Sequence, residues 1–324
     1  MNEIHCCHIE NFTTSYGVRV TGINVRYQLY GKALGSAPII VINHALTGNS
    51  QLIGTSGWWN DTVGDHKPID TQRYTILAMN IPGNGFASDE NDFITNYEHW
   101  AAVDVAKIFN LCIGKIGIAE VYALVGCSVG GGIAWEMAVL NPELFRKLVV
   151  ISADWKSSDW VIGNCLLQEQ ILKNSNNPLH DARLHAMLCY RTPQSLKMKF
   201  DRSTHPPTQL YNVESWLLHH GEKLTKRFSL ASYKLMNQLV KTIDISREKG
   251  SFAEAVQNLD ADIHIISADS DLYFVPDEDR QTAAELKQLG KNVTHNEIKS
   301  VHGHDSFLIE HEQLAEIFSN LKIW

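Results

Sequence analysis

The 324-residue sequence predicts an α/β fold in which helices flank a mostly parallel sheet, with a helical insertion between two core strands. Three observations predict it. Short, nearly continuous apolar runs recur along the chain, as expected of strands buried on both faces. Segments with apolar residues at helical spacing lie between these runs, and such alternation is typical of parallel sheets. One long stretch, residues 156–252, interrupts the alternation.

The first predicted strand differs from the others. Residues 23–29 alternate between apolar and polar side chains, which indicates a half-buried antiparallel strand near the N-terminus. The later strands are predicted from apolar runs that suit the centre of a covered parallel sheet. They span residues 38–42, 74–79, 121–125, 148–151 and 263–266.

Helices are predicted where apolar side chains recur every three or four residues. Residues 100–112 follow this spacing. So do residues 283–289, which precede Gly290 in a helix C-cap position. Residues 314–321 form the closing helix.

The stretch from residue 156 to residue 252 shows helical or loop patterns and no convincing strand. It is rich in aromatic and histidine side chains, which suits a cover over a functional site. We therefore predict a core made of residues 1–155 and 253–324, and a helical cap made of residues 156–252.

Composition excludes several classes of function. The net charge of −8 gives no basic surface for nucleic acid, and no apolar run approaches the ~20 residues of a membrane span. The N-terminus lacks the layout of a secretion signal, so we expect a soluble, cytoplasmic protein that acts on small molecules. The six cysteines have no paired spacing and are expected to be reduced. His302 and His304 could together contact a metal ion, but no His-Glu-x-x-His motif occurs and no metal site is predicted.

A strand–turn–helix with a glycine-rich turn carries the strongest chemical signal. The apolar run 121–125 leads into Gly126-Cys127-Ser128-Val129-Gly130, and helical sequence follows. In the α/β-hydrolase fold such a Gly-x-Ser-x-Gly turn exposes a nucleophilic serine, and its glycines let strand and helix pass closely. The turn does not match Gly-x-Gly-x-x-Gly or a phosphate-binding loop. We therefore predict the α/β-hydrolase fold, with Ser128 as nucleophile.

That fold requires an acid and then a histidine later in the chain. Asp269 and Asp271 both lie in the loop after the predicted strand 263–266. Asp271 is our choice for the triad, whereas Asp269 is expected to hold the loop by local hydrogen bonds. After the last strand, His304 is predicted as the base in preference to His302, which we expect to be a polar loop residue.

An oxyanion hole requires backbone amides aimed at the developing negative charge. The amide of Val129, directly after the nucleophile, is predicted to provide one donor. The loop 43–48, after the first apolar strand, should provide the other, and Leu46 is the expected donor. We expect His44 in this loop to brace it by hydrogen bonding and to take no part in catalysis.

These motifs resemble those of the homoserine O-acetyltransferases of methionine biosynthesis, which are α/β-hydrolase-fold enzymes. The resemblance covers most of the chain, and residues 213–233 are its most family-specific part. The acid loop, residues 270–274, supports Asp271 over Asp269. The matching segments are residues 43–48, 57–59, 67–71, 73–74, 126–131, 213–217, 221–223, 227–228, 232–233, 270–274 and 303–308.

The resemblance implies an acyltransferase that moves an acetyl or other short acyl group from acyl-CoA to the hydroxyl of homoserine or a similar amino acid. Acetyl-CoA is then a co-substrate, and no permanently bound cofactor is implied. One arginine of the family binds the acceptor's carboxylate; Arg183 is the best match and Arg202 the alternative. Asp305 matches the family's residue for the acceptor's amine. The family's dimers through cap helices imply a homodimer here.

Residues 81–88 depart from the family. They read Ile-Pro-Gly-Asn-Gly-Phe-Ala-Ser, like a general α/β-hydrolase turn, where the family has a Gly-Gly-Cys-x-Gly-Ser-Thr-Gly-Pro-like segment. The alternative function is therefore an esterase or other hydrolase that uses the same triad with water as acceptor. A non-catalytic binding protein is disfavoured, because the serine, acid and histidine would have to coincide by chance. Acetyl and succinyl donors are both compatible with these motifs.

Overall fold

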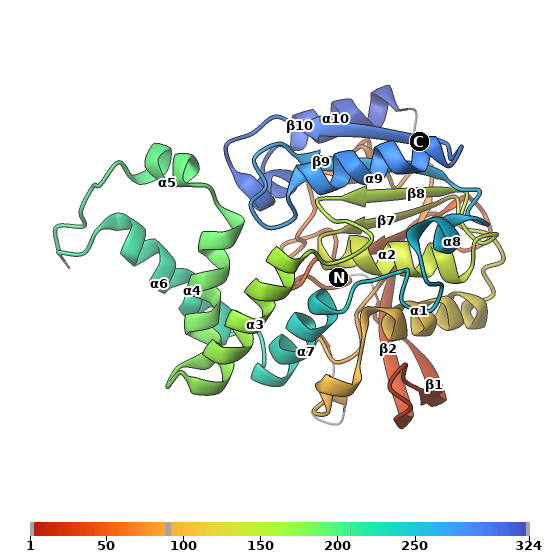
Figure 1. Cartoon of the computed structure of the whole chain (residues 1–324), viewed down its shortest axis with the longest axis horizontal. Helices are drawn as coiled ribbons and strands as arrows, with labels where there is room; N and C mark the ends of the chain where they lie inside the picture. The colour runs from red at the N-terminus through yellow and green to blue at the C-terminus, as the bar shows by residue number, and fades with distance from the viewer. Residues whose placement is uncertain (1–2, 88–91, 208, 322–324) are drawn as a thin grey trace.

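A computed structural model describes residues 3–87, 92–207 and 209–321. Its main sheet has eight strands in the order β1-β2-β6-β3-β7-β8-β9-β10 (Figure 1). The pairings β1–β2 and β2–β6 are antiparallel and the other five are parallel, which confirms the predicted mostly parallel sheet. The strands are β1 (His5–Thr13), β2 (Arg19–Gly31), β3 (Ile39–Asn43), β6 (Thr75–Met79), β7 (Ala123–Cys127), β8 (Lys147–Ile151), β9 (Asp262–Ala268) and β10 (Val293–Ile298), with a separate short pair of β4 (Val63–Gly64) and β5 (Ile69–Asp70).

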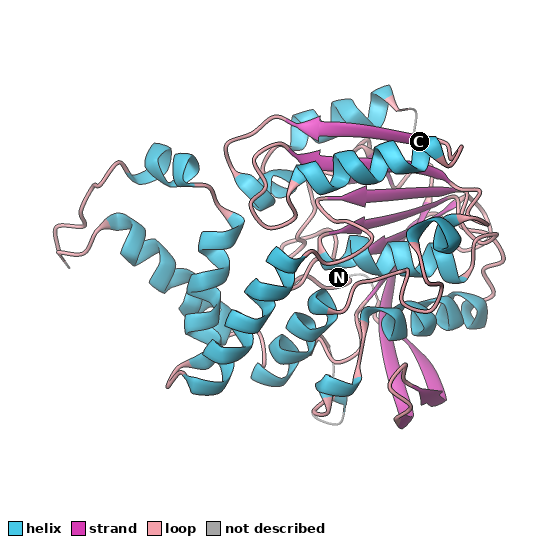
Figure 2. Cartoon of the chain, in the orientation of Figure 1, coloured by secondary structure: helices cyan, strands magenta, loops and turns pink. Residues whose placement is uncertain are grey.

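Helices cover both faces of this sheet (Figure 2). Successive side chains of a strand point to opposite faces, and β3 shows the result. The buried residues form two hydrophobic cores. Val41 packs in one core with residues of α1, α2 and α9, whereas Ile40 and Ile42 pack in the other core with residues of α10. These flanking helices are α1 (Ala102–Ile116), α2 (Val129–Leu140), α9 (Pro276–Gln288) and α10 (His311–Asn320).

Between β8 and β9 the chain forms a series of helices. They are α3 (Asp159–Asn174), α4 (Pro178–Tyr190), α5 (Pro193–Phe200), α6 (Asn212–Thr225), α7 (Leu230–Lys241) and α8 (Phe252–Val256). α3 packs against α4 and α7, and α4 packs against α6. In Figure 1, α4, α5 and α6 project beyond the end of the sheet. We propose residues 156–252, which include α3 to α7, as the cap. Within the described residues, every helix falls short of the length or apolar character that crossing a bilayer requires.

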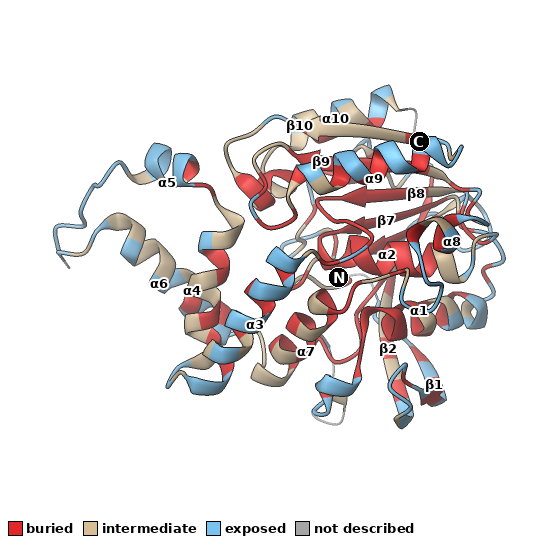
Figure 3. Cartoon of the chain, viewed as in Figure 1, coloured by how far each residue is buried: buried red, intermediate tan, exposed pale blue. Residues whose placement is uncertain are grey.

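Two edge strands were not predicted from apolar runs. β10 has the sequence VTHNEI, and only its first and last residues are buried. β1 lies at the other edge, and its side chains are mostly exposed or half-buried (Figure 3). An edge strand has one neighbour and less cover, so it carries less of the apolar signal that marks a central strand.

The parallel strands place their carboxyl ends at one edge of the sheet, where open α/β sheets bind ligands. The loops that follow β3, β7, β9 and β10 therefore come together there. These loops carry residues 43–48, Ser128, Asp271 and His304. The fold thus assembles segments that are far apart in the sequence.

Candidate active site

A one-residue turn carries the predicted nucleophile. β7 ends at Cys127 and α2 begins at Val129, so Ser128 alone joins them. Its φ of 55° and ψ of −127° form a strained conformation that residues with side chains rarely adopt. Glycines make the turn possible, because a Cβ on Gly126 would lie 2.2 Å from the carbonyl oxygen of Gly130.

Ser128, His304 and Asp271 form one hydrogen-bonded chain. His304 Nε2 lies 2.9 Å from Ser128 Oγ, and His304 Nδ1 lies 2.7 Å from Asp271 Oδ2. All three side chains are buried. Since the carboxylate can only accept, the proton on the ring belongs at Nδ1, and Nε2 faces the serine as an acceptor. This is the geometry in which a histidine removes the proton of a serine nucleophile.

The carboxylate of Asp271 is fixed from both sides. Oδ2 accepts from His304, while Oδ1 accepts from the backbone N–H groups of Tyr273 and Phe274 at 2.7 and 3.1 Å. Burial by itself lowers the pKa of His304, but the attraction and hydrogen bond of Asp271, together with the charge of Asp305, raise that pKa overall above 6.5. The protonated imidazole that forms during catalysis is therefore stabilised.

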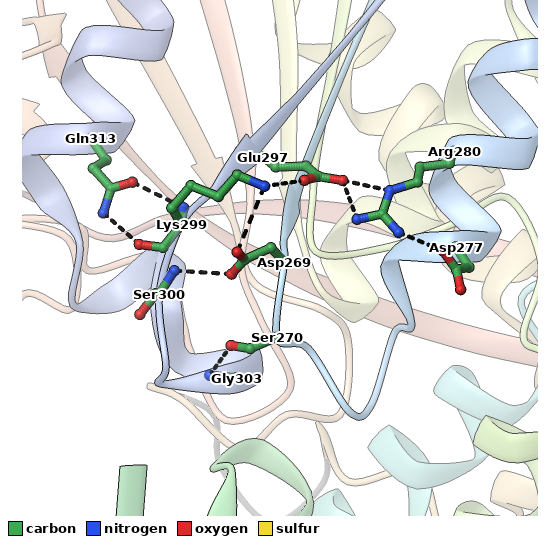
Figure 4. A network of polar contacts seen from close by, with 9 residues as sticks. All are labelled: Asp269, Ser270, Asp277, Arg280, Glu297, Lys299, Ser300, Gly303 and Gln313. Atoms are coloured by element: carbon green, nitrogen blue, oxygen red, sulfur yellow. Dashed lines mark hydrogen bonds and ion pairs between the residues drawn. The ribbon is translucent and has the colours of Figure 1, made fainter. Parts of the chain in front are cut away.

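Asp269, the alternative acid, belongs to a different network (Figure 4). Its Oδ1 accepts from the backbone N–H of Ser300 at 2.9 Å, and its Oδ2 lies 3.7 Å from Lys299 Nζ. Asp269 thus joins the loop after β9 to the loop after β10, whereas Asp271 contacts His304. Figure 4 also shows the neighbours of this network, Ser270, Asp277, Arg280, Glu297, Gly303 and Gln313.

The two predicted oxyanion donors belong to segments that touch. Val129 is the first residue of α2, where backbone N–H groups have no partner inside the helix. A Cβ on Gly130 would lie 2.5 Å from the carbonyl oxygens of Asn43 and His44. The loop that contains Leu46 therefore packs directly against the start of α2, beside the nucleophile, as the predicted oxyanion hole requires.

His44 braces this loop. Its Nδ1 donates to the carbonyl of Ala45 at 2.7 Å, and its Nε2 accepts from the backbone N–H of Ile81 at 3.1 Å. Burial lowers the pKa of His44 to about 4, although the bond to Ala45 opposes the shift. The ring is therefore neutral at pH 7 and holds the oxyanion loop to the segment after β6.

His302, the alternative base, faces the inserted helices. Its Nδ1 lies 2.9 Å from Ser195 Oγ and 3.1 Å from an Nη of Arg191. The next residue, Gly303, has a φ of 70°, and a Cβ there would lie 2.9 Å from the carbonyl oxygen of Tyr190. The loop that carries the base is therefore packed directly against residues 190–195.

Comparison with known proteins agrees with this geometry. The family described as "alpha/beta hydrolase fold" matches residues 38–311. A homoserine O-acetyltransferase from Chloroherpeton thalassium is 30% identical over 329 residues, which are 94% of this chain and 85% of that protein. The chain is a homoserine O-acetyltransferase-like member of the α/β hydrolase fold family.

Solved structures share the fold of this homoserine O-acetyltransferase-like chain. Esterase E22 superposes with a TM-score of 0.87 at 17% identity, covering 99% of each chain. A homoserine O-acetyltransferase from Staphylococcus aureus has a TM-score of 0.83 at 23% identity, covering 99% of this chain and 95% of that chain. Transferases and esterases thus share this architecture, so the choice of acceptor has to be argued from side chains.

The two residues predicted to bind the acceptor both lie near His304. The Arg183 guanidinium lies 5.8 Å from the ring centroid of Tyr190, which is 5.3 Å from that of His304. Burial raises the pKa of Asp305, although the charges of His304, Arg183 and Arg191 oppose the shift. Arg191 Nη1 lies 3.8 Å from Asp305. Within residues 3–87, 92–207 and 209–321, neither the Arg183 nor the Asp305 side chain has a hydrogen bond.

Arg202, the alternative carboxylate ligand, is exposed in the connection between α5 and α6. Its Nη2 donates to Tyr211 Oη at 3.2 Å. This connection belongs to the part of the insertion that projects away from the sheet (Figure 1). The geometry therefore favours Arg183 over Arg202.

Arg191 is a site residue that sequence reasoning missed. Its side chain is 12% exposed, and it contacts Ser195 and His302 as well as Asp305. No local sequence pattern marked it, because its partners His302 and Asp305 lie far away in the sequence. The described residues contain no group of three or more His, Cys, Asp or Glu side chains placed to hold a metal ion.

The segment that departs from the family lies between the oxyanion loop and α7. Gly83 and Gly85 both have positive φ. A Cβ on Gly83 would lie 2.7 Å from a methyl group of Leu235, and a Cβ on Gly85 would lie 3.0 Å from Ser232 Oγ. The glycines thus allow a close turn against α7. Ser88 lies outside the described residues.

Proposed function

We propose that this chain transfers an acetyl or other short acyl group from acyl-CoA to the hydroxyl of homoserine or a similar amino acid. The observation that carries the proposal is the pair Arg183 and Asp305, two opposite charges near His304: in the described chain Arg183 has neither a hydrogen bond nor an ion pair, and Asp305 has only the 3.8 Å ion pair with Arg191. An amino acid presents a carboxylate and an ammonium, so it would pair with both. The similarity to homoserine O-acetyltransferases supports this acceptor.

In the first half-reaction, Ser128 Oγ attacks the thioester carbonyl while His304 Nε2, 2.9 Å away, takes the serine proton. Asp271 stabilises the imidazolium through Nδ1. The backbone amides of Val129 and Leu46 bind the negative oxygen of the tetrahedral intermediate. The C–S bond then breaks, the CoA thiol leaves with the proton from His304, and the acyl group remains on Ser128.

In the second half-reaction, the acceptor hydroxyl gives its proton to His304 and attacks the acyl-Ser128 ester. The same amides bind the second oxyanion. The ester bond to Ser128 breaks, and His304 returns the proton to the serine oxygen. Arg183 and Asp305 would hold the acceptor by its charged groups, which keeps its hydroxyl near Nε2 and favours it over water.

Hydrolysis is the second candidate. The same triad with water as acceptor would cleave esters. Esterase E22, which has the same fold, is named as such an enzyme. Arg183 argues against hydrolysis, because a simple ester offers this cation no partner, whereas Asp305 already has Arg191 at 3.8 Å.

The test is release of CoA from acetyl-CoA with and without L-homoserine. We expect homoserine to raise the rate at least tenfold and the product to be the O-acyl amino acid. L-2-Aminobutyrate is the matched control, because it has the same charged groups and no hydroxyl; it should inhibit and accept nothing. A rate that ignores homoserine, with free acetate as product, would establish the hydrolase instead.

A further inference from the structure

Positive charge is concentrated in one part of this acidic chain. Residues 180–227 contain eight Lys or Arg against four Asp or Glu, whereas the whole chain has 28 against 36. This stretch includes most of α4 and all of α5 and α6. A local excess of cations in a protein of net charge −8 attracts anions to that region.

His220, on α6, lies within the electrostatic influence of several of these cations. Burial, followed by the charges of Arg183, His219, Lys223 and Lys199, lowers the pKa of His220 to about 4. Charged side chains from α4, α5 and α6 therefore all act on the ring of His220. Like charges repel one another, and a bound anion would relieve the repulsion.

An aromatic ring lies among these cations. Lys199 Nζ is 5.5 Å from the ring centroid of Trp216, and Arg191 Cζ is 6.0 Å from it. The rings of His220 and Phe200 lie 4.5 and 5.7 Å from the Trp216 ring, centroid to centroid. We term these five residues the Trp216 cluster. Trp216 as a residue is half-buried, so it is partly open to solvent.

Arg191 joins the Trp216 cluster to the catalytic loop. Its guanidinium lies 3.8 Å from Asp305 and 3.1 Å from His302 Nδ1, on either side of the catalytic base in sequence. A path of contacts therefore runs from the triad through Asp305 and Arg191 to Trp216.

We propose that the Trp216 cluster binds the nucleotide end of acyl-CoA. Aromatic side chains stack on bases, and Arg and Lys bind phosphate oxygens. The adenine would stack on Trp216, the phosphates would contact Lys199 and Arg191, and the pantetheine arm would run back to Ser128. This inference rests on the proposed use of acyl-CoA, and it names the part of the insertion that distinguishes acyl-CoA from a simple ester.

The test compares acetyl-CoA with S-acetyl-N-acetylcysteamine, a thioester that lacks the nucleotide. We expect Trp216→Leu to raise the KM for acetyl-CoA about tenfold, and Lys199→Ala to raise it severalfold, with the KM for the short thioester unchanged. Trp216→Tyr should keep most of the affinity, because it keeps a stacking ring. Lys197→Ala is the matched control, since Lys197 lies on the same helix and lines a hollow of about 510 Å³ with Leu196, Phe200 and Tyr211, but is not a member of the Trp216 cluster.

A KM for acetyl-CoA that is unchanged in both Trp216→Leu and Lys199→Ala would overturn the inference. An increase in Lys197→Ala alone would also overturn it, because it would place the nucleotide in the hollow. If the wild-type enzyme releases no CoA at all, the proposed function fails instead. Calorimetry with adenosine 3′,5′-bisphosphate then tests the cluster separately: binding that Lys199→Ala weakens supports it, and no binding contradicts it.

Discussion

The catalytic edge of the sheet and the inserted helices differ in how completely their polar groups are paired. At the sheet edge, His304 bonds both Ser128 and Asp271, and the second oxygen of Asp271 is also occupied. In the insertion, Arg183 lies against a ring face and Trp216 lies among cations. The chemistry is therefore set before any ligand arrives, whereas the choice of substrate depends on groups such as Arg183, which has no hydrogen bond or ion pair within the described chain.

Ser128→Ala tests the catalytic side of this comparison and should have the largest effect. We expect turnover to fall by roughly 10⁴- to 10⁶-fold, because the nucleophile itself is lost. The fold should be unaffected, since the change removes one oxygen and fills no space. Thermal unfolding measured beside the rate provides the control, and substantial residual turnover would contradict the assignment.

Asp271→Asn and Asp269→Asn separate two neighbours with different partners. Asp271→Asn should lower kcat/KM by about 10⁴-fold, because the amide cannot hold His304 in the required tautomer. Asp269→Asn should cost less than about tenfold, since it weakens contacts between two loops and leaves His304 in place. If steady-state assays show comparable losses of kcat/KM in the two variants, the roles assigned to Asp271 and Asp269 are wrong.

Arg183→Lys and Asp305→Asn test the ligand-dependent side. Each should raise the KM for homoserine about tenfold or more, because a charge-assisted hydrogen bond to the acceptor is lost; an ammonium cannot reproduce the planar fork of arginine. Acylation of Ser128 by acetyl-CoA, followed as a pre-steady-state burst, should be nearly unchanged. Arg202→Lys is the control, and an equal effect there would reject Arg183 as the carboxylate ligand.

The pH dependence should give the smallest change. The base must be neutral to accept a proton, so activity rises as the pH passes upward through the pKa of His304. Burial lowers that pKa, but Asp271 and Asp305 raise it overall, so the acid limb should have its midpoint above 6.5. In Asp271→Asn the raising contribution is lost, and the limb of the residual activity should move to lower pH. If the acid limb has the same midpoint in Asp271→Asn, the limb reports the titration of a group other than His304.

The catalytic edge could be predicted from the sequence because its signals are local. Gly126 and Gly130 lie two residues before and after Ser128, so they appear as one motif, although the contacts that require Gly130 are with Asn43 and His44. Asp271 and Asp269 both follow the same strand; Asp271 was preferred for the triad, and the resemblance to a family supported that choice. The structure separates them by direct contact, because only Asp271 reaches His304.

The inserted side was harder to predict because its contacts join distant residues. Arg191 contacts His302 and Asp305, which lie more than a hundred residues later in the sequence, and no local sequence pattern predicts such a contact. The Trp216 cluster likewise draws its members from two helices and the residue after a third. The edge strands were missed for a different reason, since β10 buries too few side chains to produce an apolar run.

Mass spectrometry of the acyl-enzyme tests the central claim most directly. The enzyme is incubated with acetyl-CoA alone, a sample is digested, and the remainder is chased with L-homoserine. Our account predicts an acetyl group on the peptide that contains Ser128, its loss on the chase, and O-acetylhomoserine as product. An unmodified Ser128 with the label on Cys127, or an acetyl group that leaves as free acetate regardless of homoserine, would contradict it.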